Sequence, residues 1–294
     1  MERSTPEVVI LGGAGDGSSI RLERAFAARG VPAVRLAFGA VSFAPGGPVL
    51  GALERLPRAV LVRSIPAGSF EQVTLRLGLL HALRELGVLV VNDARAIERC
   101  VDKSMTSFRL DAAGVATPPA WAVEDVAAAR AIVAREAAAG HEVVLKPLFG
   151  SEGRGLLRLA RADDVPAAEA VAGVWYLQRF VGRAADWEDF RLFVIGGEAV
   201  AGMRRRGTSW TTNIRQGAMP EPLAVTPALA DPAVAAARAV GAAYAGVDLI
   251  LDPAGRPLVL EVNSNPAWQG LQSVTEVDIA AALARYVAAA AGLG

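Results

Sequence analysis

Strand and helix signals alternate through the first hundred residues, and this alternation constrains the fold more than any other feature. Residues 7–13 form a continuous apolar run that ends in glycines, as expected of a buried parallel strand. Further strands are expected at 33–38, 59–63 and 88–92, and helices at 18–29 and 70–86. Strands separated by helices predict an open parallel sheet and an α/β fold.

Four glycines follow the first strand and invite comparison with a dinucleotide-binding loop. They stand at positions 12, 13, 15 and 17, and Ser18 stands where G-x-G-x-x-G would need its last glycine. The acidic residue that such a site places about 20 residues later is missing, since Phe38-Gly39-Ala40 follows the second strand. We therefore favour a tight strand-to-helix turn over an NAD-dependent oxidoreductase.

From about residue 100 the pattern changes to helices mixed with antiparallel strands. Helices are expected at 102–113, 123–138, 163–172, 227–243 and 276–290, and strands at 141–147, 156–160 and 174–180. Gly196-Gly197 separates two strand-like runs and predicts a hairpin. We divide the chain into an N-terminal domain (1–100), a central lobe (101–181) and a C-terminal lobe (182–294).

Composition narrows the class of protein. Basic and acidic residues balance at 30 each, so no overall field favours nucleic acid or an anionic membrane as partner. The single cysteine, Cys100, excludes an intrachain disulfide and fits the reducing cytoplasm, where we expect the protein. No apolar run approaches the length of a membrane span. Only Lys103 and Lys146 are lysines among the basic residues, which suggests that two positions need an ammonium group.

The segments VDLIL (247–251) and LVLEVN (258–263) flank the turn DPAGRP. If Leu251 pairs with Leu258, an antiparallel register places Asp248 opposite Glu261, with Asn263 on the same face. The opposite face would be an apolar layer that includes Leu258 and Leu260. Facing carboxylates repel each other, and a divalent cation removes that penalty. Two carboxylates and an amide oxygen suit Mg²⁺ or Mn²⁺, although a solvated polar face is the plainer alternative.

A metal–nucleotide site also needs partners for phosphate oxygens. Lys146 stands immediately before a glycine-rich loop that contains Ser151, Gly153 and Gly155. Glycines let backbone N–H groups approach phosphate oxygens closely, so this loop is a candidate phosphate-binding element. It is not a Walker A loop, because no Gly-Lys-Ser/Thr closes it into a helix.

These motifs occur in the order seen in ATP-grasp enzymes. They are Asp102-Lys103, Lys146-Pro147, Gln178-Arg179-Phe180-Val181, Asp189-Phe190-Arg191, and Asp248 with Glu261-Val262-Asn263. In detail the chain resembles the RimK-like α-L-glutamate ligases, tightly over 101–281 and loosely over the first hundred residues. The resemblance implies an ATP-grasp fold, in which an N-terminal open parallel-sheet domain precedes two lobes that clamp ATP.

The resemblance implies a role for each matching position. ATP contacts are implied for Lys103, Lys146, Gln178, Arg179, Phe180, Val181, Asp189, Thr211, Thr212 and Asn213. Asp248, Glu261 and Asn263 would hold two Mg²⁺ or Mn²⁺ ions. Position 179 is usually acidic in this family and is arginine here, so only backbone contacts with adenine are expected from it.

The implied reaction joins a carboxylate to an amine through an acyl phosphate. Arg191, Arg205 and Arg215 are candidate catalytic residues that would bind substrate carboxylates and the tetrahedral intermediate. Arg204 is a further candidate, and some of these arginines are alternatively plain solvated residues. Residues 207–218 are polar and bounded by glycines, which suggests a lid.

The identity of the substrate is the least constrained inference. Residues 62–83 resemble the subgroup that adds L-glutamate to tetrahydromethanopterin, so we expect a small-molecule carboxylate and an amino acid as partners. Arg63, Ser64, Ser69, Phe70 and Glu71 either contact this acceptor or only begin a helix, for which Ser69 is a good N-cap. Another coenzyme tail, a protein C-terminus, a dipeptide and a nucleotide-binding protein without turnover remain alternatives. We also expect a homo-oligomer.

Overall fold

The structure is a computed structural model that describes residues 6–13, 17–150, 153–182, 187–212, 214 and 217–293. A four-stranded parallel sheet forms the N-terminal domain, as the alternation predicts. Its strands lie in the order β2 (Ala33–Leu36), β1 (Val8–Leu11), β5 (Ala59–Val62) and β6 (Leu89–Val91). Helices α1 (Gly17–Ala27) and α8 (Ile279–Ala290) cover one face, and α2 (Phe70–Glu85) and α3 (Ala94–Val101) cover the other.

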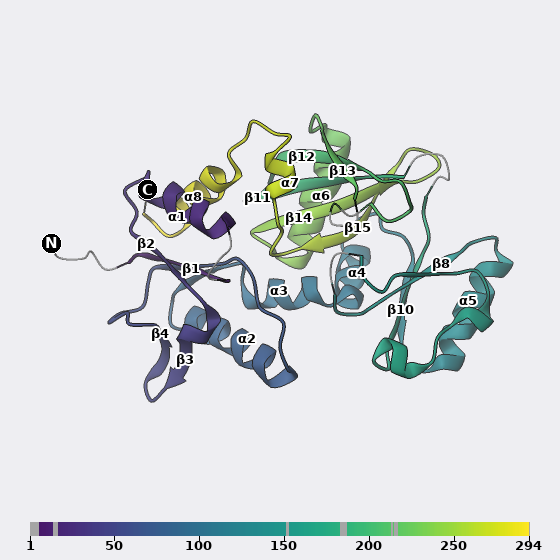
Figure 1. Ribbon diagram of the computed structural model, residues 1–294, viewed down its shortest axis with the longest axis horizontal. Coiled ribbons are helices and arrows are strands. Elements are labelled where there is room, and N and C mark those ends of the chain that lie inside the picture. Colours follow the sequence, from purple (N-terminus) through teal and green to yellow (C-terminus); the bar gives the residue numbers. More distant parts are fainter. Residues whose placement is uncertain are drawn as a thin grey trace.

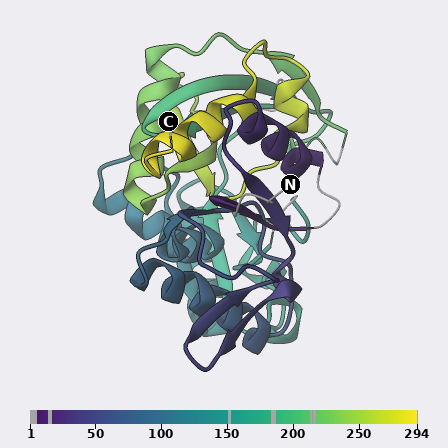
Figure 2. The same ribbon diagram turned by 90° about the vertical axis from the view of Figure 1, so that its left-hand side faces the viewer.

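The C-terminal helix returns to the first domain. Figure 1 and Figure 2 both show α8 beside α1, and apolar side chains of the two helices share one core with β1 and β5. The division at residues 100 and 181 stays a prediction, and the packing of α8 on the N-terminal sheet crosses it.

Two elements of this domain were not predicted. Strands β3 (Val41–Ala44) and β4 (Gly47–Leu50) form a hairpin whose turn places Gly46 and Gly47 at positive φ. Helix α3 begins after Asp93, whose carboxylate accepts a hydrogen bond from the Arg95 amide. Both features carry ordinary local signals, a glycine pair and an N-cap.

The central lobe is a second sheet, with antiparallel strands. Its order is β7 (Ala120–Val123), β10 (Trp175–Arg179), β8 (Val143–Lys146) and β9 (Leu157–Leu159), packed on α5 (Val126–Ala138) and preceded by α4 (Lys103–Ala112). The helix expected at 163–172 is wrong. Pro166 separates two short 3₁₀ segments, Ala162–Asp164 and Ala168–Val171, because proline disfavours helical geometry at the residue before it.

The C-terminal lobe is a five-stranded antiparallel sheet. Its order is β13 (Met219–Pro222), β12 (Glu198–Arg206), β11 (Glu188–Ile195), β14 (Tyr244–Leu251) and β15 (Pro257–Asn263). Helix α6 (Pro227–Val240) covers one face, and the short α7 (Gln269–Gln272) follows β15. The predicted hairpin at Gly196-Gly197 is confirmed, with φ of 60° and 88° at these glycines.

The pairing of β14 with β15 is partly as predicted. Asp248 lies opposite Glu261, but Leu251 pairs with Pro257 rather than with Leu258. An irregularity between Asp248 and Leu249 shifts the register by one residue, as a β-bulge does. The expected apolar layer is therefore also wrong in part, because Val259 is fully buried in the core while Leu260 lines the cleft described below.

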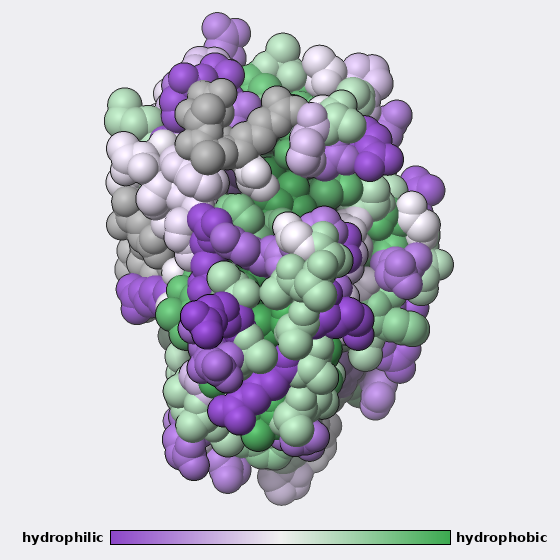
Figure 3. Space-filling model, turned by 90° about the vertical axis from the view of Figure 1, so that its right-hand side faces the viewer, coloured by the Kyte–Doolittle hydropathy of each residue, from purple (hydrophilic) through white to green (hydrophobic). Residues whose placement is uncertain are grey.

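Within the described ranges, no helix combines the length and apolarity needed to cross a bilayer. The end of the molecule formed by the central lobe is shown in Figure 3, where hydrophilic and hydrophobic residues are interspersed.

Candidate active site

A cleft of about 590 Å³ lies between the central and C-terminal sheets. This is the size of pocket that binds small molecules and cofactors. Residues of β8 and β10 line one side, and residues of β11, β12, β14 and β15 line the other. The cleft therefore opens where the two predicted lobes face each other.

Most of the predicted site residues line this cleft. They are Lys146, Gly153, Gln178, Arg179, Phe180, Val181, Asp189, Arg191, Arg205, Thr211, Thr212, Asp248, Glu261 and Asn263. Lys103 and Gly155 are not among the lining residues, although Lys103 bonds to the Gly150 carbonyl of the adjoining glycine-rich loop. Ser151, Asn213 and Arg215 lie outside the described residues. Segments far apart in sequence thus meet at one place.

The two lysines approach the cleft from the central lobe. The Lys146 Nζ donates to Gln178 Oε1 at 2.6 Å, and the Lys103 Nζ donates to the Gly150 carbonyl at 2.9 Å. Burial lowers the pKa of Lys146 to about 8 and also lowers the pKa of Lys103, while the charge of Glu261 opposes both shifts. Neither ammonium group has an ion-pair partner within 4.0 Å among the described residues, so both can accept an anionic ligand.

The glycine-rich loop has the backbone that its composition predicts. Gly150, Gly153 and Gly155 have φ of 147°, 68° and 71°, conformations that residues with a side chain rarely adopt. A Cβ at position 155 would lie 3.1 Å from Pro147. Since Lys103 bonds to the Gly150 carbonyl, this lysine also positions the loop.

Gln178 has an unsatisfied donor in the cleft. Its side-chain carbonyl accepts from Lys146, which orients the amide, and its Nε2 has no partner in the described part of the chain. Gln178 is only 2% exposed. Buried polar groups are nearly always hydrogen-bonded, so this amide indicates a ligand with an acceptor atom beside β10.

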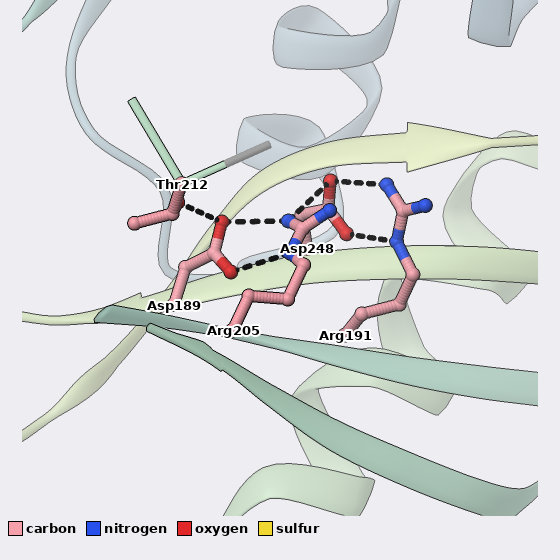
Figure 4. A network of polar contacts seen from close by, with 5 residues as sticks. All are labelled: Asp189, Arg191, Arg205, Thr212 and Asp248. Carbon is pink, nitrogen blue, oxygen red and sulfur yellow. Dashed lines mark hydrogen bonds and ion pairs between the residues drawn. The ribbon is translucent and has the colours of Figure 1, made fainter. Parts of the chain in front are cut away.

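Arginines and carboxylates of the C-terminal sheet form a continuous chain of polar contacts (Figure 4). Arg205 donates to both oxygens of Asp189 at 2.6 Å and contacts Asp248 at 3.0 Å. Arg191 donates to both oxygens of Asp248, at 2.6 and 2.7 Å. Thr212 donates to Asp189 at 2.6 Å at the other end. Such paired, charge-assisted bonds are strong and directional.

This network keeps Asp248 ionised. Burial alone would raise the pKa of its carboxyl group, but Arg191 and Arg205 outweigh burial and hold the pKa at about 2. Burial raises the pKa of Asp189, and Arg205 opposes that rise. Arg205 is only 4% exposed and engaged with two carboxylates. Its geometry suits a positioning role more than direct contact with substrate.

Asp248, Glu261 and Asn263 line one face of the cleft and suit a hard divalent cation. The Glu261 carboxylate forms no hydrogen bond or ion pair within the described part of the chain. No cluster of three or more His, Cys, Asp or Glu side chains exists there that would hold a metal by itself. Mg²⁺ is usually held by one or two carboxylates together with substrate phosphates. The donor set fits that mode of binding.

Sequence reasoning missed the aromatic wall of the cleft. Trp187 and Trp210 lie near Phe180, with ring centroids 6.3 and 6.0 Å from it. Arg158 lies over the Phe180 ring at 4.1 Å. Ile250 and Leu260 add apolar surface from the facing strands. Two tryptophans beside predicted site segments were the available signal, because such rings pack on flat ligand groups.

Two arginines point away from the cleft. Arg179 donates to the buried Glu136 at 2.8 Å. Its guanidinium is therefore bound within the central lobe, although the residue is part of the cleft lining. Arg204 pairs with Glu221 at 2.6 Å on the half-exposed side of β12. The alternative of a solvated ion pair therefore describes Arg204 best.

Three comparisons place this site among known proteins. A family model described as the RimK-like ATP-grasp domain matches residues 102–287. The tetrahydromethanopterin:alpha-L-glutamate ligase of Methanococcus maripaludis is 38% identical over an alignment of 200 positions, which covers 66% of this chain and 67% of that protein. The ligase of the same name from Methanosarcina acetivorans is 28% identical over an alignment of 262 positions, which covers 78% of this chain and 79% of that protein.

Solved structures extend the similarity in fold to almost the whole chain. The ATP-grasp ligase PsnB, complexed with a minimal precursor, Mg and ADP, has a TM-score of 0.73 and 22% identity. The match covers 97% of this chain and 98% of PsnB. The expected α/β ATP-grasp fold is thereby confirmed.

Proposed function

The chain belongs to the RimK-like ATP-grasp family, and we propose that it adds L-glutamate to the carboxylate of a small coenzyme such as tetrahydromethanopterin. It is an ATP-dependent carbon–nitrogen ligase of the family, which uses ATP and Mg²⁺. The observation that carries the proposal is the cleft, where Lys146 in the lining and Lys103 beside it, both without an ion-pair partner among the described residues, lie within reach of the charge of Glu261. This arrangement supports binding of a metal-bound triphosphate.

The pairing of charges supports the same assignment. The charged residues that line the cleft are equal in number, four cations (Lys146, Arg179, Arg191, Arg205) and four carboxylates (Glu188, Asp189, Asp248, Glu261). The three arginines are paired with carboxylates, whereas Lys146 and the neighbouring Lys103 have no carboxylate partner in the described part of the chain, which favours an anionic ligand beside the lysines. The aromatic and apolar wall at Phe180, Trp187 and Trp210 suits a planar base at the other end.

The reaction proceeds in two transfers. An oxygen of the acceptor carboxylate attacks the γ-phosphorus, the bond to the β,γ-bridging oxygen breaks, and ADP leaves. The amine nitrogen of glutamate, having lost a proton, then attacks the acyl carbon, and inorganic phosphate leaves with the carboxylate oxygen. Phosphoryl transfer depends mainly on positioning and charge neutralisation. Lys103 and Lys146 supply charge, and Gln178 keeps Lys146 oriented.

Asp248, Glu261 and Asn263 would hold Mg²⁺, and we propose two ions. Bound there, Mg²⁺ neutralises phosphate charge as it develops in the transfer. Arg191 is paired with one carboxylate and its side chain is 16% exposed, against 5% for Arg205, which is paired with two, so Arg191 is the arginine that we assign to a substrate carboxylate. Arg205 instead keeps Asp248 and Asp189 in place.

The experiment that tests this function measures ADP release from purified protein with Mg-ATP and L-glutamate. The acceptors are a reduced pterin carrier, other coenzymes with carboxylate tails, and a peptide that ends in glutamate. We expect ADP release only with an acceptor, together with a mass gain of one glutamyl unit on that acceptor. A protein that binds no ATP contradicts the proposal. Light scattering on the same sample tests the expected homo-oligomer.

A further inference from the structure

The chain just after β15 is held by buried side chains of the N-terminal sheet. Asn263 ends β15 and lines the metal face, and Asn265 and Pro266 continue along the cleft. The carbonyl groups of Ser264 and Pro266 both accept hydrogen bonds from residues about 170 to 200 positions earlier. Two residues at the carboxyl ends of β5 and β6, Arg63 and Asn92, make these bonds.

Asn92 joins the two strands that carry the metal face. Its Nδ2 donates to the Tyr244 carbonyl at 2.8 Å and to the Ser264 carbonyl at 2.5 Å. Its Oδ1 accepts from the amides of Ala243 and Tyr244, at 2.7 and 3.2 Å. The side chain is fully buried and uses its whole hydrogen-bonding capacity. It therefore sets the start of β14 against the end of β15.

Arg63 holds the next position along the chain. Its guanidinium donates to the Pro266 carbonyl and to the Tyr244 hydroxyl, both at 3.1 Å, and lies 4.0 Å from the centre of the Trp268 ring. Arg63 is 4% exposed and does not line the cleft. Its Nε has no hydrogen-bond partner in the described part of the chain. Pro266 is also packed tightly on β14, since a Cβ at Gly246 would lie 2.8 Å from it.

Both kinds of contact occur along this segment. The carbonyls of 264 and 266 bond to residues of the N-terminal sheet, while Asn263, Asn265 and Pro266 line the cleft. We propose that Arg63 and Asn92 are positioning residues, which hold residues 263–266 so that the metal face is already formed before nucleotide binds. The inference rests on the proposed function. The N-terminal sheet would then contribute to metal binding, although it is far in sequence from Asp248 and Glu261.

Binding of Mn²⁺ tests this role without turnover. The full-length protein is titrated with Mn²⁺ in the presence of a non-hydrolysable ATP analogue, and free Mn²⁺ is measured by electron paramagnetic resonance. Affinity for the analogue is measured separately without metal. Residues that orient metal ligands cost about 10- to 100-fold in metal affinity when they are lost. We expect that loss for Arg63→Met and Asn92→Ala, with analogue affinity within about twofold of the wild type.

Arg109→Met is the matched control. Arg109 also donates across to the C-terminal lobe, at 2.9 Å to the Ala239 carbonyl, but far from the cleft lining. It should leave Mn²⁺ affinity unchanged. Arg63→Lys keeps a donor for the Pro266 carbonyl and should recover part of the loss. Tyr244→Phe removes the hydroxyl that accepts from Arg63 and that donates to the Val62 carbonyl and to Asn265, so it should weaken Mn²⁺ binding in the same direction but less.

The outcomes separate the two claims. Folded Arg63→Met and Asn92→Ala proteins with wild-type Mn²⁺ affinity would overturn the positioning role, as would an equal loss in Arg109→Met. If these variants do not fold, wild-type Mn²⁺ affinity in Tyr244→Phe overturns it. A wild-type protein that binds neither the analogue nor Mn²⁺ contradicts the proposed function itself.

Discussion

The lysines and the arginines at the cleft differ in whether a carboxylate is paired with them. Among the described residues, Lys103 and Lys146 of the central lobe bond only to carbonyl and amide oxygens, and burial lowers the pKa of both. Arg191 and Arg205, from the C-terminal sheet, are each paired with carboxylates, and Arg205 also lies between two of them. Within the described residues, the two lysines of the central lobe therefore lack a carboxylate partner, whereas the two arginines of the C-terminal sheet are already paired.

This difference assigns separate tasks to the two sides. An unpaired, buried ammonium gains most from an anionic ligand, so the lysines should act on binding and turnover with little effect on stability. A buried arginine between two carboxylates is part of the folded structure, and its removal leaves charges unpaired. Substitutions that separate stability from activity can therefore break or sharpen the comparison.

Arg205→Met should have the largest effect on stability. Its removal leaves Asp189 and Asp248, both buried, without a shared partner. Breaking a buried ion pair from one side costs about 3–5 kcal/mol of unfolding free energy. Urea unfolding followed by circular dichroism measures this. Arg205→Lys keeps the charge and should lose less. A loss below about 1 kcal/mol, the value of an exposed pair, would contradict the assigned task.

Lys146→Met should remove activity while the fold stays stable. The loss of one positioned donor to developing charge typically lowers turnover by about 10²–10³-fold. Stability should change by about 1 kcal/mol, since only the bond to Gln178 is lost. Acceptor-dependent ADP release and urea unfolding are measured on the same preparation. A large loss of stability with normal turnover would place Lys146 with the arginines instead.

Nucleotide binding should weaken at alkaline pH because of Lys146. The pKa of this lysine is about 8 in the free protein, and a bound triphosphate favours its charged form. Above pH 8 binding must take up a proton, so affinity falls by up to about tenfold per pH unit, whereas below about pH 7 this lysine adds no dependence. Calorimetric titration of an ATP analogue measures it. Lys146→Arg stays protonated and should remove the dependence. An equally flat wild type would refute the lowered pKa.

Arg204→Ala should have the smallest effect. Arg204 pairs with Glu221 and Glu188 on the half-exposed side of β12 and lies outside the cleft lining. Exposed pairs contribute about 0–1 kcal/mol, so stability and turnover should both stay close to the wild type. A clear fall in turnover would contradict the assignment of Arg204 to a surface ion pair and would show that it acts at the cleft.

Local sequence patterns predicted most of the fold, and each wrong prediction has a local structural cause. The parallel sheet and the Gly196-Gly197 hairpin follow from apolar period and turn residues. The helix expected at 163–172 does not form, because Pro166 lies within it and separates two short 3₁₀ segments. The pairing of Asp248 with Glu261 was predicted correctly, but the partner of Leu251 was not. A β-bulge lies between Asp248 and Leu251, and no residue type in the sequence indicates it.

In the candidate site, only those residues could be predicted whose charge or ligand type sets them apart in the sequence. Lysines, carboxylates and glycines stand out in sequence. The engagement of Arg205 with two carboxylates depends on the register of β11 with β12 and β14. The bonds from Arg63 and Asn92 join residues more than 150 positions apart, and the aromatic wall depends on where loops fold back. Such contacts follow from tertiary packing, which periodicity does not encode.

The acyl phosphate is the central claim, and isotope transfer tests it most directly. The acceptor carboxylate is labelled with oxygen-18, and the inorganic phosphate released during ligation is analysed by mass spectrometry. The account predicts one labelled oxygen in each phosphate, because the oxygen that attacks the γ-phosphorus leaves with it. Unlabelled phosphate from a reaction that forms the amide would contradict the mechanism.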